Sequence, residues 1–146
     1  GCRLVQYVKC ELKEINLKQN IMRDIKFRGL RTDGKGFIYG NLMEYGGEFY
    51  IVPQKYSDKP FGYFEVIPES VGQFTGLKDK NGVEIYEGSI LQNPKNEIGI
   101  VVWSDAGLKL KCKRKNGDYF IIPLDQGFCN NKIIIGNIHE NKDLLK

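Results

Sequence analysis

The chain has 146 residues, of which 41% are hydrophobic and 27% charged, and it carries a formal net charge of +4. These values fit one globular domain, or two very small ones that share a core. So weak a charge requires neither an acidic nor a membrane partner. No apolar run approaches the length of a membrane span, and the start, GCRLVQYVKC, has too short an apolar stretch for a signal peptide. We therefore expect a cytoplasmic protein with no membrane partner.

Residues 1–21 precede the first methionine, Met22, and differ in pattern from the rest of the chain. Their apolar residues fall at helical spacing: Leu4, Val8, Leu12 and Ile15. The pattern fits a short amphipathic helix, and an added or loosely docked tail is the alternative. We treat 1–21 as an extension and 22–146 as the domain.

Short runs of β-branched and aromatic residues, separated by glycines, fill the rest of the chain. The clearest runs are FIYGNLMEY, GEFYIVP, IGIVVW, GLKLKCKR, DYFIIPL and KIIIGNI. Asn81-Gly82 and Asn116-Gly117 are strong hairpin-turn signals, and Gly88 allows a kink or bulge. Trp103 ends one apolar run and is expected in the core. The pattern predicts a mainly β fold.

Two stretches resemble ligand-binding loops but fit turns better. GLRTDGKG, residues 29–36, has the G-x-x-x-x-G-K spacing of a phosphate loop, yet Gly36 stands where Ser or Thr is needed and a strand-like run follows. DKNGVE, residues 79–84, places Gly82 too early for a calcium loop and has no flanking helices. We expect both stretches to be turns.

The sequence offers no obvious set of catalytic or metal-binding residues. The four cysteines form no C-x-x-C pair, and with one histidine, His139, a zinc site is not expected. His139 is expected at the surface, near the end of the chain. Paired carboxylates can carry out acid–base catalysis, so a hydrolase is one hypothesis for this chain. The candidate carboxylates are spread among predicted turns: Glu65, Glu69, Glu84 and Glu87. We expect a non-enzymatic protein with no catalytic residue, metal or cofactor.

Residues 107–123, GLKLKCKRKNGDYFIIP, form the most informative candidate surface. Alternation on a strand places the lysines on one face, and a two-residue turn at Asn116-Gly117 would pair Lys113 with Phe120 and Lys111 with Ile122. A one-residue bulge would change this pairing. The candidate nucleic-acid-binding residues are Lys109, Lys111, Lys113, Arg114, Lys115 and Phe120. The alternative is that these lysines keep an exposed strand edge from pairing with other chains.

Three stretches, in order, carry a family resemblance: MRDIKFRGLRTDGKGFIYGNL, IPESVGQFTGLKDKNGVEIYEGSIL and IGNIHENKDLL. They resemble the YopX family of phage and prophage proteins, and the similarity covers Met22–Lys146. The resemblance implies a cytoplasmic phage accessory protein with a mainly β fold and a C-terminal SH3-like barrel. It divides the domain into an N-terminal β part, 22–68, and a barrel part, 69–146. It supplies no activity, cofactor or catalytic residue.

Three residues depart from the family pattern. Ser89 stands where the family usually has an acidic residue, His139 where it has Tyr, and Lys142 where it has Pro. If the acidic residue has a role in the family, this chain lacks it. A polar turn residue is the other explanation for Ser or Asp at this position.

Two functional hypotheses follow. The first is a non-enzymatic module that binds a host or phage protein. The second is a nucleic-acid-binding β-barrel that uses the basic strand 109–115, whose affinity would fall steeply with salt. Self-association into a homo-oligomer is compatible with so many strands.

Overall fold

The computed structural model describes residues 24–53 and 62–146, so the predicted N-terminal helix lies outside the described residues. The described part is mainly β, as the sequence predicted. Its strands are β1 (Phe27–Leu30), β2 (Phe37–Tyr45), β3 (Glu48–Val52), β4 (Phe64–Val66), β5 (Gly72–Lys78), β6 (Glu84–Tyr86), β7 (Ser89–Gln92), β8 (Ile98–Ser104), β9 (Gly107–Lys113), β10 (Tyr119–Pro123) and β11 (Ile133–Asn137). Three short helical segments accompany them: η1 (Pro68–Ser70), α2 (Gln126–Cys129) and η2 (Lys142–Leu145).

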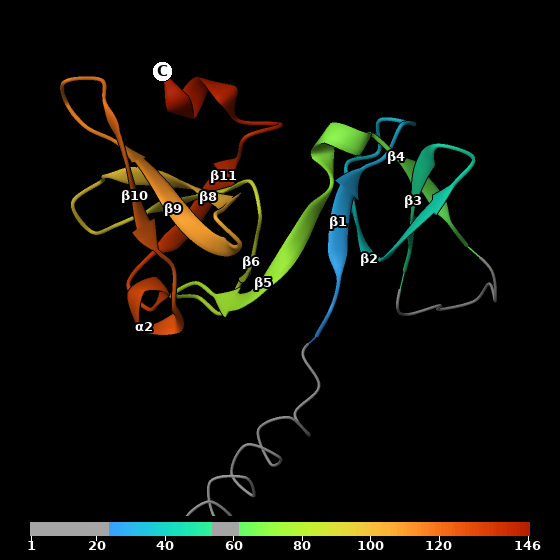
Figure 1. Ribbon diagram of the computed structural model, residues 1–146, viewed down its shortest axis with the longest axis horizontal. Coiled ribbons are helices and arrows are strands. Elements are labelled where there is room, and N and C mark those ends of the chain that lie inside the picture. The colour runs from blue at the N-terminus through green and yellow to red at the C-terminus, as the bar shows by residue number, and fades with distance from the viewer. Residues whose placement is uncertain (1–23, 54–61) are drawn as a thin grey trace, which may run out of the picture.

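The strands form two antiparallel sheets that lie beside each other (Figure 1). The six-stranded sheet has the order β4-β3-β2-β1-β5-β6, and the five-stranded sheet has the order β10-β9-β8-β7-β11. In Figure 1, β5 runs from the first sheet toward the second, where it approaches α2. Neither sheet closes into a barrel in the described part of the chain, so the SH3-like barrel stays a prediction.

The stretch 79–84 is a turn, as predicted, and a buried carboxylate organises it. Asp79 is 6% exposed, and its Oδ1 accepts hydrogen bonds from the amides of Asn81 and Val83 at 2.8 and 2.9 Å. Its Oδ2 accepts one from the amide of Ile134 in β11, at 3.0 Å. Asp79 therefore ties the turn between β5 and β6 to the second sheet, and its role is structural. Residues 29–36 likewise end β1 and turn into β2, so the resemblance to a phosphate loop is incidental.

The main core lies where β6 and α2 pack against the second sheet. Its buried members are Ile85, Leu91, Val101, Leu110 and Cys129. Gly88 forms the corner before β7: its φ is +85°, its amide donates to the carbonyl of Val101, and its carbonyl accepts from the amide of Ile138. The prediction of Trp103 in the core is wrong. This side chain is 57% exposed, because β8 continues past the core into its hairpin with β9.

A buried arginine occupies the junction between the sheets. Arg28, in β1, is 7% exposed, and its guanidinium lies over the rings of Phe37 in β2 and Tyr86 in β6, at 4.7 and 5.1 Å. Its Nη2 donates long hydrogen bonds, both 3.4 Å, to the carbonyl of Glu87 and to Ser89 Oγ. Its Nε has no hydrogen-bond partner among the described residues. We call these residues the Arg28 junction.

Candidate binding groove

The hairpin of β9 and β10 carries the candidate site, and its register differs from the prediction by one residue. Lys113 pairs with Tyr119, Cys112 with Phe120 and Lys111 with Ile121. The Arg114 amide donates to the carbonyl of Asp118. This bond leaves three residues, 115–117, in the loop where two were expected. Gly117 has φ +93° whereas Asn116 does not have a positive φ. This geometry fits a three-residue loop with a glycine bulge, the alternative that would change the pairing.

The shifted register separates the predicted site residues onto two faces. Residues directly opposite in an antiparallel pair share a face. Tyr119 and Ile121 therefore lie with the strand lysines, whereas Phe120 lies on the other face, with Cys112 and Leu110. We call the first group the lysine face; it consists of Lys109, Lys111, Lys113, Tyr119 and Ile121.

The edge-protection interpretation of the lysines is wrong for β9. This strand is paired on both sides, with β8 and with β10, and the edges of the five-stranded sheet are β10 and β11. Lysines on an interior strand do not shield an unpaired backbone. Lys111 instead lies over the ring of Tyr119, with Nζ 4.6 Å from the ring centroid.

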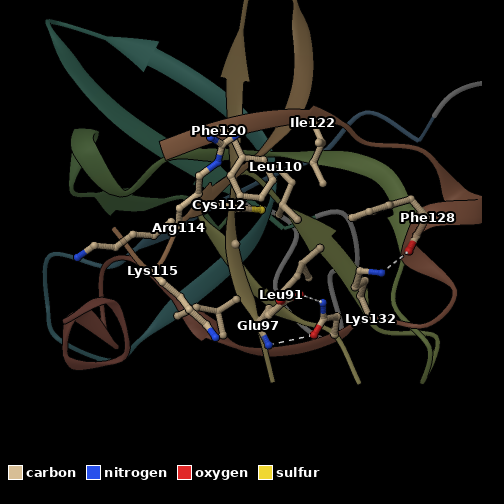
Figure 2. Close-up of a pocket in the computed structure, with 14 residues that line it drawn as sticks. Leu91, Glu97, Leu110, Cys112, Arg114, Lys115, Phe120, Ile122, Phe128 and Lys132 are labelled. Atoms are coloured by element: carbon tan, nitrogen blue, oxygen red, sulfur yellow. Dashed lines mark hydrogen bonds between the residues drawn. The ribbon is translucent and has the colours of Figure 1, made fainter. Parts of the chain in front are cut away.

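A hollow of about 480 Å³ opens on the face of the sheet that carries Phe120 (Figure 2). We call it the groove. Its apolar lining comes from β7, β8, β9, β10 and α2: Leu91, Ile98, Leu110, Cys112, Phe120, Ile122 and Phe128. Gly99 completes the floor, where a Cβ atom would come within 2.6 Å of Leu110 and 2.9 Å of Cys112. The volume lies within the range of about 300–1,000 Å³ typical of ligand sites.

Basic side chains surround this apolar lining. Figure 2 shows Arg114 and Lys115 on one side of the groove and Phe128 and Lys132 on the other. Lys113 also lines it, and Glu97 is the one acidic residue among the lining residues. Glu97 accepts a hydrogen bond from the side-chain amide of Asn93, at 2.7 Å. The groove thus combines an apolar floor with a net positive rim. We call Lys113, Arg114 and Lys115 the rim cations.

Each aromatic wall of the groove carries a cation. The Arg114 guanidinium lies 5.2 Å from the ring centroid of Phe120, and Lys132 Nζ lies 4.0 Å from that of Phe128. Lys132 is 8% exposed, and its Nζ also donates to the carbonyl of Phe128 and to Asn131 Oδ1. Lys132 is therefore held in place, whereas the rim cations are exposed.

A free thiol lies inside the groove. The Cys112 sulfur is drawn in the centre of Figure 2, and burial raises the pKa of this thiol. The other described cysteine, Cys129, is fully buried in the core. Cys112 is therefore a chemical handle on the groove, and because its raised pKa leaves less thiolate, its alkylation requires an alkaline pH.

The sequence predicted no groove, but four of the six candidate nucleic-acid-binding residues line it, whereas the residues of the opposite wall were not among the candidates. Lys113, Arg114 and Lys115 line the groove with Phe120, whereas Lys109 and Lys111 do not. The missed residues, Phe128 and Lys132, are four apart at α2, where Asp125 Oδ1 caps the helix by accepting from the amide of Phe128, at 2.7 Å. The signal in the sequence was Asp125, a typical helix N-cap residue, followed by Phe128 and Lys132 at a spacing of four residues.

A second hollow, of about 280 Å³, lies near the lysine face. Lys111, Tyr119 and Ile100 line it, together with Leu144 and Leu145 of η2. The rim cations border both hollows. Among residues 24–53 and 62–146, no three His, Cys, Asp or Glu side chains gather where they could hold a metal ion. No helix in this part is long and apolar enough to span a membrane.

The geometry defines a mainly β protein with an amphipathic groove. The chain matches the model of the YopX protein family over residues 16–146 and belongs to this family. The match includes residues 16–21 of the extension. A crystal structure of protein EF1440 from Enterococcus faecalis is 26% identical, with a TM-score of 0.49, over 86% of this chain and all of that one. No curated protein matches the chain.

Proposed function

We propose that this protein is a non-enzymatic accessory module of a phage or prophage that binds a host or phage protein in the bacterial cytoplasm. The groove is the observation that carries the proposal. Protein-binding sites commonly seat one or two apolar anchor residues in a desolvated pocket surrounded by polar contacts. Here a pocket lined by Leu110, Ile122 and two phenylalanines is surrounded by basic residues.

Nucleic-acid binding is the second candidate, and the lysine face favours it. Lys109, Lys111 and Lys113 share a face with Tyr119, and a lysine row beside an exposed aromatic ring can follow a phosphate backbone while stacking a base. Tyr119, which is 54% exposed, takes the role that the sequence assigned to Phe120.

Two variants separate these functions. Lys109→Glu with Lys111→Glu reverses charge on the lysine face only, because neither residue lines the groove. Alkylation of Cys112 fills the groove and leaves that face intact. The alkylated protein needs Cys2→Ser and Cys10→Ser to give a single reactive site, since Cys129 is buried.

Fluorescence anisotropy with labelled DNA and RNA, together with co-purification from bacterial lysate, then provides the test. We expect a co-purifying protein that the groove-alkylated form loses and the charge-reversed form keeps. Salt-sensitive nucleic-acid binding that disappears in the charge-reversed form, with no groove-dependent protein, would transfer the function to the lysine face.

A further inference from the structure

We infer that the groove binds an acidic segment of the partner protein and buries one bulky apolar side chain of that segment. The inference rests on the proposed protein-binding function of the groove and specifies the chemistry of its occupant. It follows from the charges at the rim, the shape of the floor and the occupied faces of the aromatic walls.

The rim has a net positive charge. Lys113, Arg114 and Lys115 are exposed, and none of them makes an ion pair within the described residues. The one acidic lining residue, Glu97, is hydrogen-bonded to Asn93. A partner that brings carboxylates to this rim gains charge-assisted hydrogen bonds, and Arg114 can bind a carboxylate through two parallel donors.

The floor requires an apolar group. Leu91 and Leu110 are buried at its base, and Ile122 and the two phenylalanine rings form its walls. A charged or strongly polar side chain placed there would lose its hydration without gaining partners. A leucine, phenylalanine or tryptophan side chain matches the apolar lining and fits within a volume of about 480 Å³.

The aromatic walls favour a protein segment over a nucleic acid. Base stacking needs a free aromatic face, and Arg114 occupies one face of Phe120 while Lys132 occupies one face of Phe128, so each ring keeps less surface for a base. Arg114 is exposed, so its guanidinium keeps N–H donors that can bind a carboxylate while it lies over the ring of Phe120. The groove is therefore suited to acidic side chains at its rim and an apolar one between its rings.

A displayed library of short random peptides tests this directly on the full chain. Peptides are selected on the unmodified protein and then counter-selected on the Cys112-alkylated form, so that only groove-dependent binders remain. We expect these binders to combine Asp or Glu with a neighbouring Leu, Phe or Trp. A synthetic binder should lose roughly tenfold or more in affinity with Arg114→Glu and Lys115→Glu, and little with Lys109→Glu, which is the matched control on the other face.

The outcomes distinguish the two proposals. Groove-dependent binders that lack acidic residues, or that bind the rim variant equally well, overturn the acidic-segment inference and leave protein binding in place. If no groove-dependent peptide emerges, the inference is overturned. If, in addition, the protein binds nucleic acid through its lysine face, the proposed protein-binding function is overturned as well.

Discussion

Arg28 and Arg114 both lie over phenylalanine rings at similar distances, yet their surroundings are opposite. Arg28 lies 4.7 Å from the ring of Phe37, is 7% exposed, and is enclosed where the two sheets meet. Arg114 lies 5.2 Å from the ring of Phe120 and is exposed at the groove rim. The same contact therefore serves packing in one place and leaves a cation available to a partner in the other.

The two guanidinium groups differ in their contribution to stability, because folding removes water from Arg28 and leaves Arg114 hydrated. Burial lowers the pKa of the Arg28 guanidinium from its ordinary value, and Tyr39, Tyr86 and Glu140 oppose this shift. Arginine remains charged even so. Removing part of a buried contact network has a large cost, whereas exposed cation–π pairs contribute on the order of 0.5–1 kcal/mol.

The largest effect is expected from Arg28→Ala. It removes the side chain that packs between Phe37 and Tyr86 and leaves a cavity between the sheets. We expect the free energy of unfolding to fall by about 3 kcal/mol, measured by urea denaturation. Arg28→Met restores most of the volume without the charge and is the control. If Met recovers the full stability, the junction depends on packing alone and the charge contributes nothing.

Ser89→Asp should act in the opposite direction. Ser89 is fully buried, its Oγ lies 3.4 Å from Arg28 Nη2, and the family resemblance leads us to expect an acidic residue at this position. A carboxylate there would pair with a cation that is already buried, so we expect the free energy of unfolding to rise by about 1–2 kcal/mol. Ser89→Asn has the same size without the charge. Equal stability of the two variants would show that charge pairing is not what Arg28 lacks.

The local features of this fold could be predicted from the sequence. Asn81-Gly82 and Asn116-Gly117 mark turns because glycine accepts the positive φ observed at Gly82 and Gly117. Gly88 marks the corner into β7 for the same reason. The apolar runs gave the strands, because β-branched and aromatic residues at short intervals favour extended structure.

The features that involve distant segments could not be predicted. Both a two-residue and a bulged three-residue loop accept Asn116-Gly117, so the residues alone leave the register open, and the register decides whether Phe120 or Tyr119 joins the lysines. Phe128 and Lys132 reach the groove only because α2 packs near the end of β5, where the Gln126 side chain exchanges two hydrogen bonds with the backbone of Lys78. Nothing local encodes that approach.

His139 offers a smaller, pH-dependent test of the junction. The sequence placed it at the surface, but it is half-buried, with its ring edge-on to Phe37 at 6.3 Å. Burial lowers the pKa of His139 below its ordinary 6.5, the charges of Arg28 and Lys142 lower it further, and Glu140 opposes them. The unfolded chain then takes up the proton first, so the stabilising contribution is present above the unfolded pKa and is lost as pH falls toward the folded pKa.

Urea denaturation at several pH values between about 7 and 5 measures this loss. We expect His139→Gln to have a weaker dependence of the unfolding free energy on pH in that range than the parent chain. The difference between the two chains isolates His139 from the carboxylates, which titrate in both. Parallel pH profiles for the two chains would mean that the junction does not disfavour the histidinium.

The smallest effect is expected from Arg114→Ala. Its guanidinium covers one ring face and makes no ion pair within the described residues, so we expect the unfolding free energy to fall by no more than about 1 kcal/mol. The same urea measurement that reports Arg28→Ala checks it. A loss of unfolding free energy as large as that of Arg28→Ala would mean that Arg114 holds Phe120 in the groove wall. Arg114 would then be required for folding and would not be available to a partner. A negligible loss leaves Arg114 as a cation that folding does not require, which is the condition for its use by a partner.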